Sequence, residues 1–430
     1  MGDDKIHAEL SPSSADRWMT CAGSVALSRG VARTESRYAQ EGTDHHEVAA
    51  LCLEEGHDAA TLVGRPMLSG ALLTEENAVH VQTYLNIVRG YRDTLNGEVR
   101  VEESVPISFL TGELHAKGTA DAVIFIPQPE LIVVDLKFGM GVEVSPDDNR
   151  QLKIYAAAVL QKHEIWEDYK TVRLVIVQPR TGSQSVKEWV CTIDELQQFC
   201  VEVRAASKAV RHLTGFVAPL GTTREIPMVI TPDILAALHP SEKACKFCPA
   251  KAGCPALKTF VEKAIRTDVN DFENEETKLW PAERRQESNS ILLGVSMDAC
   301  GLVEIWLHAV RAKVESELLA GHPVQGVDGF YKLVRGRKGN RKWDDADAVK
   351  GIMETYKLKS EEMFDYSLIS ASTAEKRFAK KRPHVWEGLH PHITQSEGSL
   401  SVADAKDPRP AVSQEAPAAG FETEDGSDLL

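Results

Sequence analysis

The chain has 430 residues, of which 43% are hydrophobic and 26% are charged. This length is enough for two or three ordinary domains, and this apolar fraction is enough to bury their cores, which excludes a wholly disordered protein. Asp and Glu number 64 against 49 Lys and Arg, so the formal net charge is −15. That balance excludes a uniformly basic surface that binds nucleic acid non-specifically, and any nucleic-acid contact must therefore be local.

The sequence favours a soluble protein. Its first ten residues, MGDDKIHAEL, lack the basic start and apolar run of a signal peptide. The most apolar long segment, residues 291–310, is interrupted by Asp298, Glu304 and His308, which predicts a buried helix and not a membrane span. We therefore expect a cytoplasmic protein without a membrane partner.

Hydrophobic periodicity predicts a helical layer that precedes a sheet. Alternating and continuous apolar runs then predict three strands, and the Pro-Gln-Pro-Glu segment at 127–130 joins the second and third as a hairpin. The predicted elements in chain order are a short helix within 11–30, helices at 41–55 and 75–95, strands at 99–107, 120–126 and 131–136, a helix at 149–162 and a strand at 172–178. This order predicts an α/β fold with a mixed central sheet flanked by helices.

The C-terminal half is predicted to be mainly helical, with a cysteine loop at 245–254. Further elements are expected as helices at 194–214 and 283–320, a basic hairpin at 329–343, and helices near 344–357 and 372–380. Residues 396–430 hold eight acids against Lys406 and Arg409, which predicts a disordered acidic tail. The predicted regions are 1–265 with the sheet and the cysteine loop, 266–394 as a helical region with the basic hairpin, and 395–430 as the tail.

Two of the predicted strands carry charged residues in a pattern that suggests metal-dependent chemistry. Gly-Thr-Ala-Asp121 begins one strand, and Asp135-Leu-Lys137 ends the next. Because residues i and i+2 of a strand share a face, these three side chains can meet at one end of the sheet. Two carboxylates there would hold Mg²⁺ or Mn²⁺, while the ammonium contacts an attacking water or a phosphate. The alternative interpretation is that they are solvated turn residues.

Further polar residues surround this pattern. Gln151 and Tyr155 lie at i and i+4 on the next predicted helix, where an amide and a phenol can orient a water and a phosphate. Alternatively, Tyr155 packs on the sheet and Gln151 is exposed. His46, near the start of an earlier helix, is a candidate metal ligand, although a lone histidine usually has no such role. Glu102 and Glu103 are predicted to be surface residues.

Together these motifs resemble the RecB-like branch of the PD-(D/E)XK nuclease superfamily, over roughly residues 10–260. The order matches throughout: Gly42-x-x-x-His46, Gly-Thr-Ala-Asp121, Asp135-x-Lys137 and Gln151-x-x-x-Tyr155. The surrounding residues look like a phage-encoded group within that superfamily. The resemblance implies a restriction-endonuclease-like core in 1–265, a catalytic set of Asp121, Asp135, Lys137, Gln151 and Tyr155, and a metal held by His46, Asp121, Asp135 and the backbone carbonyl of Leu136.

Three cysteines, Cys245, Cys248 and Cys254, follow C-x₂-C-x₅-C spacing in a short loop, and Cys21 is the best candidate for a fourth ligand. Both zinc and an iron–sulfur cluster suit four thiolates. The resemblance to RecB-like nucleases of the AddB and CRISPR-associated four-cysteine types implies a structural [4Fe–4S] cluster that staples the two ends of the domain. The remaining cysteines are interpreted as ordinary core or helix residues: Cys52, Cys191, Cys200 and Cys300.

A basic segment between Tyr331 and Trp343 is a candidate nucleic-acid contact, in which cations follow a phosphate backbone and an aromatic ring stacks on a base. A solvated edge hairpin is an equally good interpretation. The candidate binding residues are Arg335, Arg337, Lys338, Arg341 and Lys342. A second basic patch, within 376–382, is more typical of a charged helix end. The sequence contains no P-loop motif, so a separate helicase would have to supply any ATP-driven movement along nucleic acid.

We therefore expect a metal-dependent DNA nuclease, an exonuclease acting in phage DNA replication or recombination within the host cytoplasm. DNA is the expected partner, and a phage single-strand-binding protein, a helicase or a recombinase are candidate protein partners. The rival hypothesis is a non-catalytic nucleic-acid-binding or assembly protein that keeps the nuclease fold. A zinc-stapled scaffold protein is a third hypothesis.

Overall fold

The chain divides into two compact units, Met1–Val334 and Arg335–Leu430. The computed structural model describes residues 8–31, 37–140, 143–181, 184–215, 229–266, 282–327 and 329–333, with a few single residues between 375 and 387. The candidate DNA-binding cations of the basic hairpin, most of the two predicted C-terminal helices and the acidic tail lie outside these residues. The predicted boundaries at 265 and 394 stay predictions.

A five-stranded mixed sheet forms the centre of the first unit, with strand order β1-β2-β3-β4-β5. Its strands are β1 (Glu98–Pro106), β2 (Lys117–Phe125), β3 (Glu130–Leu136), β4 (Thr171–Val177) and β5 (Val186–Thr192). Neighbouring strands are antiparallel except β3 and β4, which are parallel. The predicted mixed α/β fold and the hairpin between the second and third strands are confirmed.

The local sequence explains most of these strands. Residues 131–136 of β3 are all buried, as their continuous apolar run predicts for a strand covered on both faces. The edge strand β5 was not predicted, because its sequence, VKEWVCT, mixes charged and apolar residues and its burial is low. It is recognised only from its pairing with β4.

Helices surround the sheet, and several begin at capping residues. Thr74 and Asn149 accept hydrogen bonds from backbone N–H groups at the starts of α4 and α6, and Thr192 forms a capping box with Glu195 at the start of α7. The helices are α1 (Ala15–Thr20), α2 (Gly23–Ser28), α3 (Arg37–Glu55), α4 (Glu75–Leu95), α5 (Ser108–Thr111), α6 (Arg150–His163), α7 (Ile193–Thr214), α8 (Pro232–Ala236), α9 (Glu242–Lys246), α10 (Pro255–Arg266) and α12 (Ala282–Leu319).

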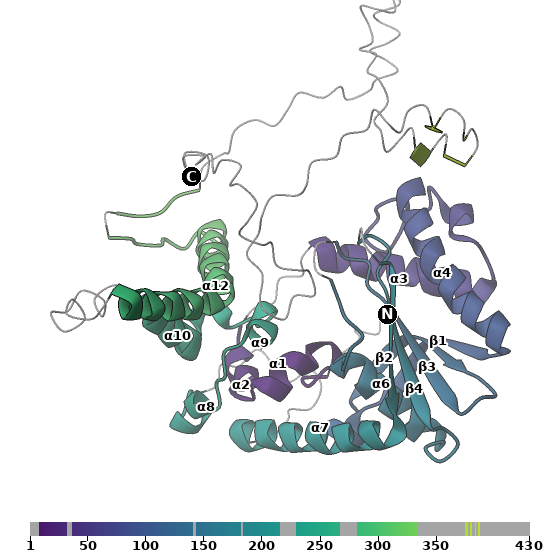
Figure 1. Cartoon of the computed structure of the whole chain (residues 1–430), viewed down its shortest axis with the longest axis horizontal. Helices are drawn as coiled ribbons and strands as arrows, with labels where there is room; N and C mark the ends of the chain where they lie inside the picture. The colour runs from purple at the N-terminus through teal and green to yellow at the C-terminus, as the bar shows by residue number, and fades with distance from the viewer. Residues whose placement is uncertain are drawn as a thin grey trace, which may run out of the picture. The chain divides into compact units, whose positions relative to one another are not determined.

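Two hydrophobic cores lie on the two faces of the sheet. On one face, α3 and α4 pack against strand residues such as Ile124 and Val134. On the other face, α6 and α7 pack against strand residues such as Val123 and Val133. Figure 1 shows these two helical layers on either side of the strands. Side chains from both layers can therefore reach the end of the sheet.

The N-terminal helices pack against the segment that carries the cysteine loop. Gly23 in α2 lies so close to α8 that an added Cβ would be 2.6 Å from the Ile234 carbonyl oxygen. The Gly23 backbone N–H donates to the Ala237 carbonyl at 3.0 Å. A glycine is needed here because no larger residue fits this approach, which brings Cys21 close to the cysteine loop.

The long helix α12 differs from the prediction of a buried helix. The most apolar 18-residue window within Leu293–Leu319 has a mean hydropathy of 1.3, and only 17% of that window is buried. Within the described residues, α12 is the one helix long and apolar enough to cross a membrane. Leu302 and Ala309 are buried, whereas Leu293 and Met297 are exposed. Apolar residues occur on all sides of this helix, so contact with α9 and α10 on one side leaves the others uncovered.

Candidate functional site

Two aspartates lie beside each other at the end of the β2–β3 hairpin. The antiparallel register pairs Ala122 with Val134. The next pair of residues along the two strands is Asp121 and Asp135, which therefore lie opposite each other. Asp121 Oδ2 accepts a hydrogen bond from the Leu136 backbone N–H at 2.7 Å. The Asp135 side chain is only 3% exposed. Two carboxylates therefore share a site with little access to water.

The charges in this site move the pKa values of the two aspartates apart. Burial, together with the charge of Asp121, raises the pKa of Asp135. Burial also acts to raise the pKa of Asp121, but the positive charges of His46 and Lys137 outweigh it and lower that pKa. A divalent cation would stabilise the ionised forms of both aspartates, because its positive charge attracts both carboxylates.

Lys137 follows β3 directly, where its backbone N–H donates to the Val177 carbonyl at 2.8 Å. Its Nζ atom lies 2.8 Å from Asp135 Oδ2 and donates to Gln151 Oε1 at 3.1 Å. Gln151 donates from Nε2 to Asp135 Oδ1 at 3.3 Å. The predicted grouping of Asp121, Asp135 and Lys137 is confirmed, and Gln151 is half-buried in this network.

His46 reaches the same carboxylates from α3, on the other face of the sheet from α6. Its Nδ1 atom lies 3.4 Å from Asp121 Oδ1. Burial acts to lower the pKa of His46, but the charges of Asp121 and Asp135 outweigh it and raise the pKa to about 9. A metal ion at this position would displace the histidine proton, because a ligating imidazole must be neutral.

His45 has a different environment from His46. Its ring stacks on Phe138 with the ring centroids 3.7 Å apart, and the Arg180 guanidinium lies 4.9 Å from the Phe138 centroid. Arg180 also forms a 2.7 Å ion pair with Glu41 at the start of α3. This stack attaches α3 to the segment after β3, so it positions the helix from which His46 reaches the aspartates.

Tyr155 both packs on the sheet and joins the polar network. It is 7% exposed, and its hydroxyl accepts a hydrogen bond from Gln151 Nε2 at 3.4 Å. An added Cβ on Gly118 would lie 2.8 Å from Tyr155 Cε1. The glycine of the Gly-Thr-Ala-Asp motif therefore leaves room for the tyrosine ring.

Glu102 belongs to this site, although the sequence predicted a surface residue. In β1 the pairs Val101↔Ala122 and Glu103↔Ala120 flank it, so Glu102 lies opposite Asp121. Carboxylate oxygens of Glu102 and Asp121 and a ring nitrogen of His46 all lie within 4.8 Å of one another. Within the described residues this is the one such group of three or more. Sequence analysis missed the position of Glu102, because this position depends on the register of β1 against β2. Residue spacing along the chain does not reveal that register.

Glu103, the neighbour of Glu102, is half-buried and paired with two basic side chains. Its Oε1 atom lies 2.6 Å from Lys162 Nζ and 3.1 Å from His163 Nε2. Lys162 also donates to the Ser104 carbonyl. The two adjacent glutamates therefore have different contacts. Glu103 pairs with two residues at the end of α6, and Glu102 lies next to Asp121.

The four predicted cysteine ligands line one cavity between the N-terminal helices and the cysteine loop. Cys21, Cys245, Cys248 and Cys254 are each less than 9% exposed. The His239 backbone N–H donates to Cys21 Sγ at 3.2 Å. Burial raises the pKa of Cys245 to about 11. A bound cation would be needed to keep such buried thiols ionised.

The sulfurs in this cavity are not tightly clustered. No three of them lie within 4.8 Å of one another among the described residues. Four sulfurs on a single zinc ion would be about 3.8 Å apart, given zinc–sulfur bonds of about 2.3 Å. The cavity therefore brings the four cysteines together without the spacing that one tetrahedral ion requires.

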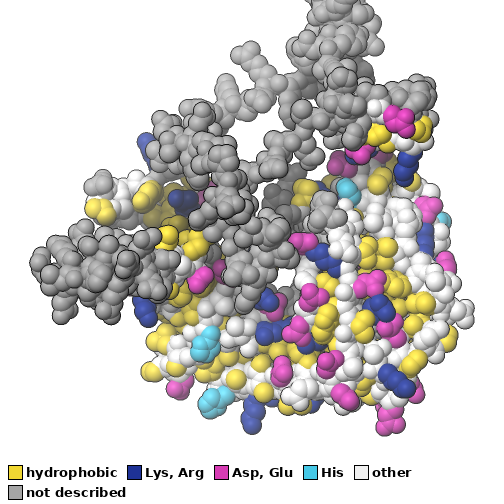
Figure 2. All heavy atoms as spheres, viewed as in Figure 1, with side chains coloured by type: hydrophobic (Ala, Val, Ile, Leu, Met, Phe, Trp, Pro, Cys, Tyr) yellow, Lys and Arg dark blue, Asp and Glu magenta, His cyan; other side chains and the backbone are white. Residues whose placement is uncertain are grey.

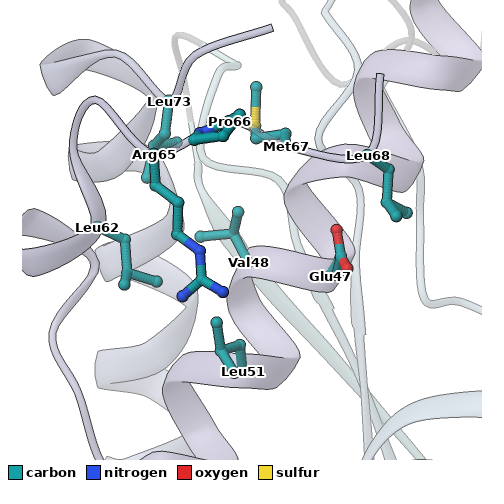
Figure 3. Close-up of a pocket in the computed structure, with 9 residues that line it drawn as sticks. All are labelled: Glu47, Val48, Leu51, Leu62, Arg65, Pro66, Met67, Leu68 and Leu73. Carbon is teal, nitrogen blue, oxygen red and sulfur yellow. The ribbon is translucent and has the colours of Figure 1, made fainter. Parts of the chain in front are cut away.

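A separate cavity of about 170 Å³ lies beside α3. Figure 3 shows the Arg65 side chain extending between Leu51 and Leu62, and Glu47 also lines this cavity. This cavity includes none of the predicted site residues.

Figure 2 shows Lys and Arg interspersed with Asp and Glu over the described surface in that view. This distribution agrees with the exclusion of a uniformly basic surface.

The sequence matches a described protein family over most of its length. Residues 7–410 match the family described as a protein of unknown function (DUF2800). The chain belongs to the DUF2800 family. Among solved structures, the DUF2800 chain is similar to one titled "Crystal structure of SSO0001", with 15% sequence identity and a TM-score of 0.23, covering 55% of this chain and 94% of that one. At this score the similarity supports no conclusion about fold or function.

Gly118→Ala should lower the free energy of unfolding by about 1–3 kcal/mol, because the added methyl overpacks against Tyr155. In a Tyr155→Ala background the same substitution should cost much less, since the ring is absent. Urea unfolding of the four proteins in this double-mutant cycle measures the coupling. An equal cost in both backgrounds would show that the close contact is not what requires glycine.

Proposed function

We propose that this DUF2800 protein is a Mg²⁺- or Mn²⁺-dependent DNA nuclease with a RecB-like PD-(D/E)XK core. The observation that carries the proposal is the convergence of Asp121, Asp135 and Lys137 at one end of the sheet, with Gln151 hydrogen-bonded to two of them. Two carboxylates and a lysine in such a site suit phosphodiester hydrolysis better than a structural role, because buried like charges destabilise a fold unless a cation compensates them.

The donor set fits a hard divalent cation. Carboxylate and carbonyl oxygens with one imidazole suit Mg²⁺ or Mn²⁺. In this proposal His46, Asp121, Asp135 and the Leu136 carbonyl hold the ion. A bound ion would supply Lewis-acid stabilisation of the phosphate and lower the pKa of a coordinated water.

The remaining residues position the water and the phosphate. Lys137 presents its ammonium beside Asp135, where it can orient an attacking water or neutralise charge on the phosphodiester. Gln151 holds Lys137 and Asp135 at fixed positions through its two hydrogen bonds. Tyr155 supports Gln151 through its hydroxyl. A network of this kind limits the movement of each side chain before substrate binds.

The face of α3 next to His46 leaves room for a substrate. Gly42 lies one turn before His46 on the same helix face, and an added Cβ there would meet nothing within 4 Å. Glycine inside a helix costs about 0.5–1 kcal/mol relative to alanine. No packing contact within the described protein requires this glycine, which favours close approach of a DNA strand. Exonuclease activity, and a role in phage replication or recombination with a helicase or recombinase, extend the proposal.

We further propose that Cys21, Cys245, Cys248 and Cys254 hold a [4Fe–4S] cluster. The four thiols line one cavity, and four cysteine thiolates are the ligand set of such a cluster. The cluster would join residues before the sheet to residues after it, so its role would be structural.

Asp135→Ala should abolish Mg²⁺-dependent cleavage of DNA and leave DNA binding intact, because the metal loses a ligand while the DNA-contacting surface is unchanged. Gel assays of cleavage and binding on one substrate measure both, with Asp168→Ala, an exposed aspartate, as the matched control. Equal cleavage by the Asp135 variant and the parent would reject the site. Binding without cleavage in the parent would favour a non-catalytic nucleic-acid-binding protein.

Cys248→Ser should remove a broad absorbance near ~400 nm from anaerobically purified protein, because the cluster loses one of its thiolates. It should also lower the melting temperature. Cys300→Ser, at an exposed cysteine of α12, is the matched control and should retain the absorbance. Metal analysis of the parent decides the alternative, since a colourless parent that contains zinc would replace the cluster with a zinc site.

A further inference from the structure

We propose that two copies of this chain associate through α12, with the two helices packed side by side in opposite directions. None of the candidate metal-site residues belongs to α12, so this association does not depend on the proposed function. The surface involved is a largely uncovered stripe along one side of the helix. It combines apolar side chains with one acidic and one basic residue, and a second copy of the same stripe complements it.

One side of α12 is covered by the segment that carries the cysteine loop. Leu302 packs with Cys245 and Cys254 in one apolar cluster, and α12 contacts α9 and α10. Leu307 is five residues further on and therefore about 140° round the helix, on the opposite side. Residues spaced alternately by three and four positions continue this side as one stripe. The stripe consists of Leu293, Met297, Cys300, Glu304, Leu307, Arg311, Val314 and Leu318.

The apolar members of this stripe are poorly covered. Leu293, Met297 and Leu307 are exposed, and Cys300 is exposed as well. A contiguous exposed apolar surface of this kind is typical of a contact with another protein or with a membrane. The two charged residues within the stripe decide which of these partners fits.

Glu304 and Arg311 lie on the stripe to either side of Leu307, and both are exposed. Among the described residues neither has an ion-pair partner, whereas Lys313 and Glu317 of the same helix pair at 2.5 Å. Seven residues separate Glu304 from Arg311, which is about 10 Å along a helix and too far for the two to pair with each other. A second chain can supply the opposite charge to each.

A second copy, turned by a two-fold rotation about an axis near Leu307, supplies both charges. Glu304 of each copy then faces Arg311 of the other, so the interface holds two reciprocal ion pairs. In a parallel arrangement Glu304 would face Glu304 and Arg311 would face Arg311, and like charges in contact disfavour association. The charge pattern therefore selects the antiparallel dimer.

The same rotation matches the apolar residues of the two stripes. Met297 of one copy meets Leu318 of the other, and Cys300 meets Val314. Apolar surface at both ends of the stripe is thereby removed from water, which favours association. Glu315 is exposed beside the stripe, so it would remain at the rim of the interface.

A lipid bilayer is the other partner that the hydropathy of α12 suggests, because the helix is long and apolar enough to cross one. Insertion would place Glu304 and Arg311 among lipid chains without water, at a high free-energy cost. The antiparallel dimer pairs these charges instead. They therefore favour a second copy of the chain over a membrane.

The test is sedimentation of the full chain over a concentration series, in which the parent should reach twice the mass of one chain. Glu304→Arg and Arg311→Glu should each raise the dimer dissociation constant about 10-fold or more, because each variant places like charges opposite each other twice. Combining both substitutions should restore the constant to within about 3-fold, since the pairs form again with their signs exchanged.

Asp298→Arg is the matched control, because it makes the same change of charge on an exposed residue one turn before the buried Leu302. It should leave the dissociation constant unchanged. A parent that stays monomeric, or a double variant as weak as the single ones, would overturn the proposal. A monomeric parent that binds lipid vesicles would replace the second copy with a membrane. Cleavage of DNA tests the proposed function separately in either case.

The direction of the two helices can be tested by cross-linking with diamide, which oxidises two neighbouring thiols to a disulfide. Val314→Cys should give a covalent dimer through Cys300 of the second copy, and adding Cys300→Ser should abolish it. The parent should give no such dimer, because an antiparallel pair holds its two Cys300 residues about 20 Å apart along the helices. A disulfide between the two Cys300 residues of the parent would show a parallel pair and contradict the proposal.

Discussion

The structure of the first unit depends on how negative charge is compensated at one end of its sheet. Asp121 and Asp135 lie side by side there, with Asp135 almost fully buried. Uncompensated carboxylates in such a place would destabilise the fold. His46 and Lys137 provide the positive charge, from α3 and from the residue after β3. The two helical layers therefore meet at these carboxylates as well as at the hydrophobic cores.

This arrangement links the fold to the proposed chemistry. α6 brings Gln151 to the lysine and the buried aspartate, and the His45–Phe138 stack fixes the helix that carries His46. Each side chain is held before any ligand binds, which is what metal-assisted hydrolysis requires. The cysteine cavity lies outside this network and joins the start of the chain to residues after the sheet. Its proposed cluster would stabilise the unit without taking part in the reaction.

Much of this fold follows from local sequence patterns. Periodicity predicts the long helices α3, α4, α6, α7 and α12 and the first four strands, but not α5, α8, α9 or α10. The i, i+2 rule predicts that Asp135 and Lys137 meet Asp121 at one end of the sheet. Glu102 could not be predicted in this way, because its place beside Asp121 depends on the register of β1 and on an unusual backbone angle. β5 is recognised only by its pairing, and the exposure of α12 depends on which neighbours cover it. Contacts of that kind are tertiary and leave little trace in a single sequence.

The most direct test of the central claim is digestion of end-labelled linear and circular DNA by anaerobically purified protein with Mg²⁺ or Mn²⁺, with Lys137→Ala alongside. The account predicts that the parent degrades linear DNA and that the variant does not, because the ammonium beside Asp135 is lost. The end label then reports the polarity of degradation. If the parent leaves both DNAs intact, or if the variant cleaves as fast as the parent, the proposed active site is wrong.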